Sequence, residues 1–308
     1  MRADSLVGRR VVVRRRIDSP THRFSDVVGQ LEAAGETVVV RTEDGDRIAI
    51  AAADVHRIKP VPPGPAEILE LERIAALGWP APEIERLGGW LLRAGDGWTG
   101  RANSVLPLAD PGRPLIDAIG AVRAWYAARG LPARFAVPLP AAAPLDHVLQ
   151  REGFTAERET AVLTARLVTA AVPDLPAGVR LESADRPSDR WLGAAYGDPA
   201  RLPPVARSIL AGAARPVFIT LVGAGTVLAH ARAVADEGWL GITALSVRQQ
   251  DRRRGLASAL LLWLHRWGLE NGAAAAYLQV LADNAPARAL YRRSGYQLHH
   301  TYRYRVAQ

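Results

Sequence analysis

One short stretch of this sequence constrains the fold more than any other. An apolar run, Trp239 to Val247, leads into the residues RQQDRRRG and then into a segment from Leu256 to Trp267 whose apolar residues recur at helical spacing. The pattern predicts a buried strand, a loop and a helix in direct succession. The first N–H groups of a helix and the positive end of its dipole attract anions, and guanidinium groups offer paired donors to phosphate oxygens. The loop is therefore expected to bind a phosphate group.

A second block follows this loop. Another apolar strand is predicted at Ala275 to Leu281, and after it come Asn284, a short helical segment from Ala287, and the residues YRRSGY that begin at Tyr291. Asn284 also fits a helix N-cap, because Asn-Ala-Pro is typical of a helix start.

The two blocks resemble those of GNAT-superfamily N-acetyltransferases. Arg252-x-x-Gly255-x-Ala257 is similar to that family's Arg/Gln-x-x-Gly-x-Gly/Ala pyrophosphate loop, and the second block is similar to its Asn followed by Leu-Tyr-x-x-x-Gly-Phe/Tyr. The resemblance covers roughly residues 178 to 306. It implies that the chain is an acyltransferase whose co-substrate is acetyl-CoA.

The resemblance also implies a set of site residues. Leu245, Ser246 and Val247 are expected to pair with the pantetheine arm, and the backbone N–H of Val247 to meet the oxyanion. Tyr291 is expected to face the sulfur and to protonate the departing thiolate. The residues expected to bind acetyl-CoA are Leu245, Ser246, Val247, Arg252, Arg253, Arg254, Gly255, Leu256, Ala257, Ser258, Asn284, Ala287 and Tyr291.

The general base is less clearly indicated. Glu237 and Asp236 are the carboxylates nearest to the first strand, and Glu237 is the catalytic candidate, although both also fit a solvated hairpin turn. His230 lies on a predicted strand, where a lone histidine is more often structural. Thr243 or Ser246 is a further alternative, by holding a water molecule that relays the proton.

Several residues recur at one constant separation of 142 positions. The pairs are Val105 and Val247, Trp125 and Trp267, Gly130 and Gly272, Gly153 and Gly295, and Phe154 and Tyr296. We interpret this as an internal duplication. The sequence thus predicts an α/β (α+β) protein with a tandem GNAT fold, its halves at residues 66–170 and 178–308, joined by a short linker.

The first copy has lost the residues that carry the chemistry. The positions that match Arg252, Gly255, Asn284 and Tyr291 are occupied by Asp110, Arg113, Ala142 and Leu149. An acid in place of an arginine disfavours phosphate, so the first copy is expected to be degenerate and to serve packing or the shape of the substrate cleft.

The strand before the loop also differs between the copies. Trp98 to Val105 is one residue shorter than Trp239 to Val247. One extra residue is what a β-bulge requires, and a bulge bends its strand and frees backbone groups. We therefore expect the second copy alone to open a gap beside this strand.

Charge and composition narrow the classes of function. The net charge is +8, yet Lys59 is the only lysine, and the abundance of Ala, Gly and Pro indicates a coding bias more than a basic surface. Nucleic acid is therefore not the default partner, although it is not excluded for the N-terminal part. The chain has no cysteine, so a disulfide or a cysteine nucleophile is excluded.

The histidines do not occur at the spacing of metal ligands, so no metal is predicted. The sequence shows no signal peptide and no membrane-spanning segment, so a cytoplasmic protein that does not bind a membrane is expected.

The first residues of the chain predict a separate domain. Residues 1–59 contain short runs rich in β-branched residues, with EDGD at 43–46 as a hairpin signal, which is typical of a small SH3-like or Tudor-like β-barrel. Residues 60–65 are rich in proline and are expected to form a stiff linker.

The whole arrangement resembles actinobacterial proteins described as N-acetylglutamate synthases of a two-GNAT type. This implies L-glutamate as the acceptor amine and a role in arginine biosynthesis, with Arg93, Arg101, Arg232 or Arg248 facing its carboxylates. Two alternatives stay open: an acetyltransferase acting on protein or peptide lysines or N-termini, and a non-catalytic acetyl-CoA-sensing regulator that binds nucleic acid.

Overall fold

The computed structural model describes residues 6–42, 44–169, 171 and 174–308. The chain divides into two compact units, Met1–Gly64 and Pro65–Gln308. Within the described residues, no helix is long and apolar enough to cross a membrane.

The N-terminal unit is one antiparallel sheet. Its strands are β1 (Arg10–Arg16), β2 (Phe24–Ala33), β3 (Thr37–Arg41), β4 (Arg47–Ala51) and β5 (Val55–Pro60), in the order β4-β3-β2-β1-β5. Alternate residues such as Val11 and Val13 are fully buried on one face, as a strand with one solvated face requires. The expected closed barrel is not found in the described residues, because the strand order leaves β4 and β5 as the two edges of an open sheet. β5 also extends into the expected linker, as far as Pro60.

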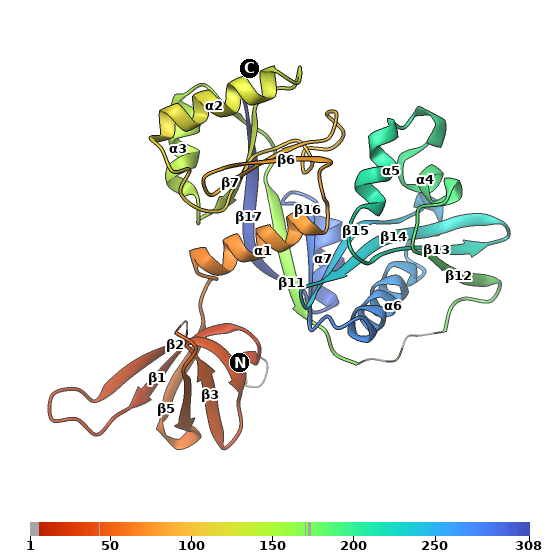
Figure 1. The fold of residues 1–308 in the computed structure, drawn as a ribbon. Helices are drawn as coiled ribbons and strands as arrows, with labels where there is room; N and C mark the ends of the chain where they lie inside the picture. The colour runs from red at the N-terminus through yellow and green to blue at the C-terminus, as the bar shows by residue number, and fades with distance from the viewer. Residues whose placement is uncertain (1–5, 43, 170, 172–173) are drawn as a thin grey trace. The chain divides into compact units, whose positions relative to one another are not determined.

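The second unit combines a large mixed sheet with helices on both faces (Figure 1). Its first elements are α1 (Pro65–Leu77), β6 (Glu83–Leu87), β7 (Trp90–Ala94), β8 (Leu106–Pro107), α2 (Leu115–Ala127), β9 (Arg134–Leu139), α3 (Ala143–Arg151), β10 (Thr155–Ala156) and β11 (Thr160–Arg166). The remaining ones are β12 (Val179–Ala184), α4 (Asp189–Tyr196), α5 (Pro204–Ala211), β13 (Pro216–Gly223), β14 (Thr226–Asp236), β15 (Trp239–Val247), α6 (Leu256–Glu270), β16 (Ala275–Leu281), α7 (Ala285–Arg293) and β17 (Gln297–Val306).

The last strand of each half pairs with a strand of the other half. The order is β10-β17-β11-β16-β15-β14-β13-β12, with β9 also paired to β17. β11 pairs antiparallel with β16, from Thr160↔Leu281 to Arg166↔Ala275. β17 pairs antiparallel with β9, from Thr301↔Leu139 to Val306↔Arg134. The expected halves are therefore not separate bodies but one compact unit, because each completes its sheet with a strand of the other.

A buried ion pair fastens β17 to the first half. Arg305 on β17 donates from Nε to Asp146 Oδ1 and from Nη2 to Asp146 Oδ2, each at 2.9 Å. Both residues are buried, and the two hydrogen bonds hold the pKa of Asp146 below its usual range. β11 has no such tie in the described residues; instead its Ala161, Leu163 and Ala165 enter the apolar core of the second half.

The secondary structure repeats with the separation seen in the sequence. Shifted by 142 positions, the bounds of α3, Ala143–Arg151, coincide with those of α7, Ala285–Arg293, and α2 overlaps α6 almost completely. Both α3 and α7 are followed by a glycine in the left-handed region, Gly153 at φ +81° and Gly295 at φ +87°, which stops the helix. The halves differ at their start, where the second half has β12, α4 and α5 and the first half has α1 alone. They also differ at β8, because most of the strand expected at Ala102 to Leu106 is a loop.

Candidate functional site

The centre of the site is a bulge in β15. His230 of β14 pairs with Ser246, but Arg232 pairs with Thr243, so two residues of β15 lie opposite one of β14. One of the two, Ala244, has φ +51°, a left-handed conformation that a bulge imposes. The extra residue expected from the sequence is therefore present as a bulge.

Beyond the bulge, β15 separates from β16. Their parallel pairing ends at Ile242↔Leu278, although β15 continues to Val247. The N–H of Arg248 donates to Leu228 O of β14 at 2.8 Å, and backbone groups alternate in direction along a strand. The N–H of Val247 therefore points to the opposite edge, toward the gap left by β16. Leu245, Ser246 and Val247 thus lie together on an open strand edge.

In the loop after β15, two arginines are paired with a buried aspartate. Asp251 accepts from Arg248 Nε at 2.5 Å and from Arg254 Nη1 at 2.7 Å, and the hydrogen bond from Arg248 is the main cause that lowers the pKa of Asp251. Arg252 Nε donates to Val247 O at 3.3 Å. Arg252 therefore contacts the end of β15, while Arg248 and Arg254 are paired with Asp251 inside the loop.

Gly255 turns the loop into α6. It is the N-cap residue of that helix, with φ +78° and ψ −5°, and no side chain caps the helix there. A Cβ at this position would contact nothing within 4 Å, so the glycine leaves open space in front of the first N–H groups of α6. Leu256, Ala257 and Ser258 supply those groups, and a helix start of this kind attracts anions.

α7 brings a tyrosine toward the same region. Asn284 caps this helix by accepting from the N–H of Ala287 at 3.2 Å, so its side chain serves the helix start. Tyr291 is buried, with its ring 5.9 Å from that of Tyr296. Burial raises the pKa of Tyr291, which keeps its hydroxyl protonated and able to donate at neutral pH.

Glu237 does not join this group. It lies in the turn between β14 and β15, with φ +44°, at the opposite end of β15 from Val247. Its carboxylate accepts hydrogen bonds from Arg73 of α1. The hairpin turn therefore holds Glu237 at the far end of β15 from the open edge, with its carboxylate paired to Arg73.

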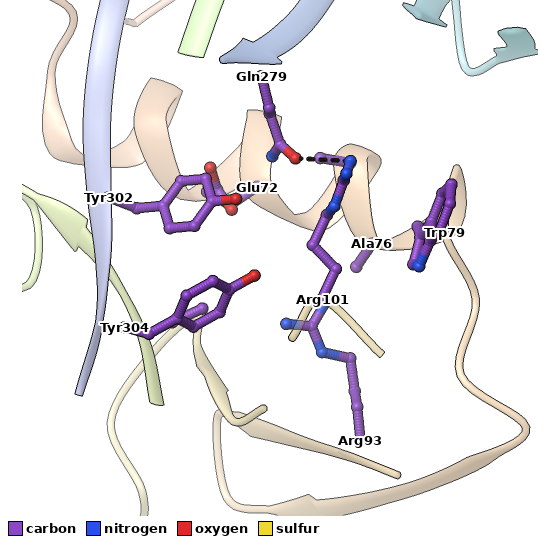
Figure 2. Close-up of a pocket in the computed structure, with 10 residues that line it drawn as sticks. Glu72, Ala76, Trp79, Arg93, Arg101, Gln279, Tyr302 and Tyr304 are labelled. Atoms are coloured by element: carbon purple, nitrogen blue, oxygen red, sulfur yellow. Dashed lines mark hydrogen bonds between the residues drawn. The ribbon is translucent and has the colours of Figure 1, made fainter. Parts of the chain in front are cut away.

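A cavity lies beside the point where β15 and β16 separate. It is a small, half-open hollow between α1, the loop before β8 and strands β16 and β17. Its interior has room for about one water molecule, and its empty volume reaches ≈ 270 Å³ only when the open solvent at its mouth is counted. Figure 2 shows Arg101 between Trp79 and the two tyrosines Tyr302 and Tyr304. Arg101 Nη1 donates to Gln279 Oε1 at 3.1 Å, and its guanidinium lies 4.7 Å from the centre of the Trp79 ring.

The loop that carries Arg101 is held by one asparagine. Asn103 Oδ1 accepts from the N–H groups of Gly95 (2.8 Å) and Gly97 (2.9 Å), and Asn103 Nδ2 donates to Trp98 O and Thr99 O at 2.9 Å each. These bonds coil the segment around a buried side chain. This is why the strand expected from Ala102 is reduced, and why Arg101 reaches the cavity.

Glu72 of α1 also lines the cavity and is almost fully buried. Its Oε1 lies 2.8 Å from Nε2 of His300 on β17. Nδ1 of His300 lies 2.8 Å from Nδ1 of His299. A carboxylate from the first half and two histidines from the end of the second half therefore form one chain of contacts.

The arginines considered for a substrate carboxylate have separate environments. Arg93 and Arg101 line the cavity, and Arg93 donates to Ser104 through Nε and Nη2. Arg232 is fully buried and donates to backbone carbonyls of α5 and of the end of α1, and burial lowers its pKa to about 10. Arg248 is engaged by Asp251.

Sequence reasoning missed Glu72 and His300. A signal for Glu72 existed, because it lies four positions after Ile68 and one after Leu71 and so falls on the apolar face of α1. A carboxylate on a buried face needs a partner. Nothing in the local sequence indicates that this partner is His300, far away in the chain.

Comparison with protein families identifies both parts of the chain. Residues 65–305 match the family described as "Probable histone acetyltransferase Rv0428c C-terminal", and residues 5–59 match the "Rv0428c N-terminal Sm-like domain". The N-terminal sheet is thus assigned as Sm-like and not as the SH3-like barrel expected.

Two curated relatives are similar over most of their length. The "Probable histone acetyltransferase Rv0428c" of Mycobacterium tuberculosis is 33% identical over 98% of this chain and 96% of its own. The "Uncharacterized N-acetyltransferase YobR" of Bacillus subtilis is 26% identical over 78% of this chain and 98% of its own.

Solved structures share the fold of the second unit. A GCN5-related N-acetyltransferase from Kribbella flavida has a TM-score of 0.60 at 20% identity and covers 79% of this chain and 95% of its own. A tandem GNAT protein from the clavulanic acid biosynthesis pathway has a TM-score of 0.55 at 16% identity and covers 80% of this chain and 89% of its own. With the family match and the relative at 33% identity, these likenesses lead to one conclusion: the chain belongs to the GNAT family of N-acetyltransferases, with an Sm-like domain at its N-terminal end.

Proposed function

We propose that the second half binds acetyl-CoA along the open edge of β15 and at the start of α6. GNAT acetyltransferases use acetyl-CoA, and the observation that carries the assignment is the separation of β15 from β16 next to a left-handed glycine. The pantetheine arm pairs with Leu245, Ser246 and Val247. The pyrophosphate meets Arg252, Arg253 and Arg254 and the helix start that Gly255, Leu256, Ala257 and Ser258 form, while Asn284, Ala287 and Tyr291 line the site from α7.

Within this site, two groups act on the reacting atoms. The N–H of Val247 donates to the oxygen that gains charge when the amine attacks. Tyr291 donates its proton to the departing thiolate, and its raised pKa supports this role because the hydroxyl is protonated at neutral pH.

We infer further that the first half is a degenerate copy of the second. The coincidence of α3 and α7 at one constant separation supports this, as does the exchange of β11 and β17, in which each terminal strand takes the same place in the opposite half. The first half retains no phosphate loop, and it contributes α1 and the Arg101 loop to the cavity.

The acceptor is a small primary amine that carries an anionic group, and L-glutamate is the first candidate. Arg101 lines the cavity and forms no ion pair with any residue that the structure describes, so it offers its charge to a ligand. The second candidate is a protein or peptide amine, which the name of the mycobacterial relative favours.

The test is the release of CoA from acetyl-CoA, followed by thiol titration with L-glutamate, other amino acids, polyamines and a lysine peptide. Saturable turnover with glutamate supports the small-amine proposal, and turnover with the peptide alone supports the second candidate. Acetyl-CoA binding without acetylation of any amine in this panel contradicts both.

Replacing Tyr291 tests its role in the same assay. We expect Tyr291→Phe to lower kcat roughly 100-fold, as the loss of a general acid does, with little change in the dissociation constant for acetyl-CoA. The control is Tyr296→Phe, which removes a buried hydroxyl bonded to His265 Nε2 at 2.7 Å; it should reduce stability by about 1 kcal/mol and leave kcat unchanged. An unchanged kcat in Tyr291→Phe excludes the tyrosine as the acid.

A further inference from the structure

We propose that Glu72 takes the proton from the acceptor amine, and that His300 positions Glu72 for this step. The inference rests on the proposed function, because it assigns the general base of the same reaction. It places the base in the first half of the chain, on α1, although the acetyl-CoA site is built by the second half.

The cavity adjoins the gap in which the thioester is expected. Gln279 follows Leu278, the last residue of β16 that pairs with β15. The side chain of Gln279 lines the cavity together with Glu72 and accepts a hydrogen bond from Arg101. An amine in the cavity therefore lies near the place where the two strands separate and near Glu72 (Figure 2).

Elimination leaves Glu72 as the proton acceptor. Of the described residues that line the cavity, Glu72 is the only carboxylate; the other ionisable ones are Arg93, Arg101, Tyr302 and Tyr304. Burial raises the pKa of Tyr302 and of Tyr304, so both hydroxyls are protonated at neutral pH. An arginine is protonated as well.

The carboxylate keeps one oxygen for the substrate. Oε1 of Glu72 is engaged by His300. Oε2 has no hydrogen-bond partner among the described residues, and it does not belong to their fully buried side-chain atoms that lack a partner. The nearby charges are Arg93 on β7 and Arg101 on its loop, and the nearby phenols are Tyr277 on β16 with Tyr302 and Tyr304 on β17. Oε2 thus faces the cavity as its one anionic acceptor.

The histidine contact orients this carboxylate. His300 Nε2 lies 2.8 Å from Glu72 Oε1, where its N–H can donate to the carboxylate. Nδ1 of the same ring lies 2.8 Å from Nδ1 of His299, and burial, with a smaller effect of His300, lowers the pKa of His299 to about 3, so that His299 is neutral. The His300 ring is therefore fixed at both nitrogens, and so is the carboxylate that it holds.

The proton balance of the step is simple. The bound ammonium passes one N–H proton to Oε2 of Glu72, and the free amine forms a C–N bond to the carbonyl carbon of the thioester. The C–S bond breaks, the thiolate takes a proton from Tyr291, and the nitrogen loses its second proton, which restores the tyrosine. Glu72 then releases its proton to solvent, so the products are the acetylated amine, CoA and one proton.

The first test is Glu72→Gln, which keeps the size of the side chain. We expect kcat/KM at neutral pH to fall roughly 100-fold and then to rise about tenfold per pH unit toward alkaline pH, because only the spontaneously deprotonated amine reacts. Glu70→Gln is the matched control on the exposed side of α1 and should match the wild type. A folded Glu72→Gln protein with wild-type rate and pH profile overturns the proposal while the acetyltransferase function stands.

His300 is tested as a positioning residue. We expect His300→Ala to lower kcat roughly tenfold with the wild-type pH profile, and His300→Gln, whose amide can donate to Glu72, to recover most of it. If both variants change only the melting temperature, His300 has no positioning role and that part of the proposal is wrong.

A second measurement covers the case in which no amine is acetylated, so that the proposed function has failed. Binding of L-glutamate and of the lysine peptide is measured by calorimetry, with and without CoA, for wild type and Glu72→Gln. Affinity that is at least tenfold weaker in the variant supports Glu72 as the partner of the ammonium group. Equal affinity, or no binding to either protein, overturns the assignment of this cavity.

Discussion

The two halves of the second unit contain the same crossing from strand to helix, closed in one and open in the other. In the first half, the N–H of Val105 donates to Arg134 O and the N–H of Ala136 donates to Val105 O, each at 2.8 Å, so pairing persists to the start of β8. In the second half, pairing ends at Ile242↔Leu278 and the strands diverge. The same succession of elements therefore yields paired strands in one place and an open strand edge in the other.

The loops that follow differ in the same sense. In the first half, Asp110 Oδ1 accepts from the N–H of Gly112 at 2.7 Å, so the chain supplies its own anion to the loop before α2. In the second half, the acid of the loop, Asp251, faces Arg248 and Arg254, and the N–H groups at the start of α6 stay available. At the constant separation of 142, the two acids differ by one position, and this small difference separates a structural loop from one suited to phosphate.

The largest expected effect concerns the exchange of strands. Expressed as separate chains, residues 66–167 and 178–308 should each fail to fold, because β17 completes the sheet at β9 and β11 completes it at β16. Co-expression should restore a folded complex. Circular dichroism and size-exclusion chromatography check both; a folded, soluble second half alone breaks the comparison, since the first half would then be dispensable.

The next effect concerns the two loops. Gly255→Asp should weaken acetyl-CoA binding on the order of 100-fold, since a like charge at an anion site costs several kcal/mol. Asp tolerates left-handed backbone better than most residues, so strain is small at φ +78°. Gly112→Asp, at φ +74° in the first-half loop, is the control and should not change the calorimetric affinity. Equal losses in both variants contradict the assignment of the phosphate site.

The smallest expected effect concerns the buried ion pair that fastens β17 to the first half. Asp146→Asn should lower the free energy of unfolding by about 3 kcal/mol at neutral pH, because it leaves Arg305 buried without its partner. The pKa of Asp146 is lowered in the folded state, so its contribution is present above the unfolded pKa and is lost as pH falls through the folded value. Wild type and variant should therefore converge in acid, as followed by denaturant unfolding.

The control is the half-exposed pair of Glu159 and Arg303, joined at 2.9 Å. Glu159→Gln should cost less than about 1 kcal/mol, as a solvated pair does. If Asp146→Asn costs no more than this control, the buried pair is not what fastens β17.

Local sequence was sufficient where a helix or loop depends on its own residues. The Arg/Gly loop, α6, β16 and the cap of α7 follow from apolar spacing and from Asn284-Ala285-Pro286. The one-residue surplus in β15 predicted its bulge. These features are decided within a few neighbours, so a single sequence contains them.

Long-range pairing was beyond the same reasoning. Alternation identifies residues 160–166 as a strand but does not say that its neighbour is β16. Closeness in sequence to β15 makes Glu237 the candidate base. Glu72 instead reaches the cavity through the packing of α1, and His300 reaches Glu72 through the exchange of β17. Spacing does not reveal Glu72 as the proposed base, because the cavity that it lines is built by α1, β16 and β17, which are distant in the chain.

The exchanged strands also dictate when the molecule can be finished during its own synthesis. The ribosome makes the chain from the N-terminus, and domains ordinarily fold in that order. Here β9 pairs on one edge with Val105, but its other edge gains a partner only when β17, Gln297–Val306, has been made. The older half must therefore wait, incomplete, until β17 has been translated. Until then it exposes a free strand edge, which favours pairing with other chains.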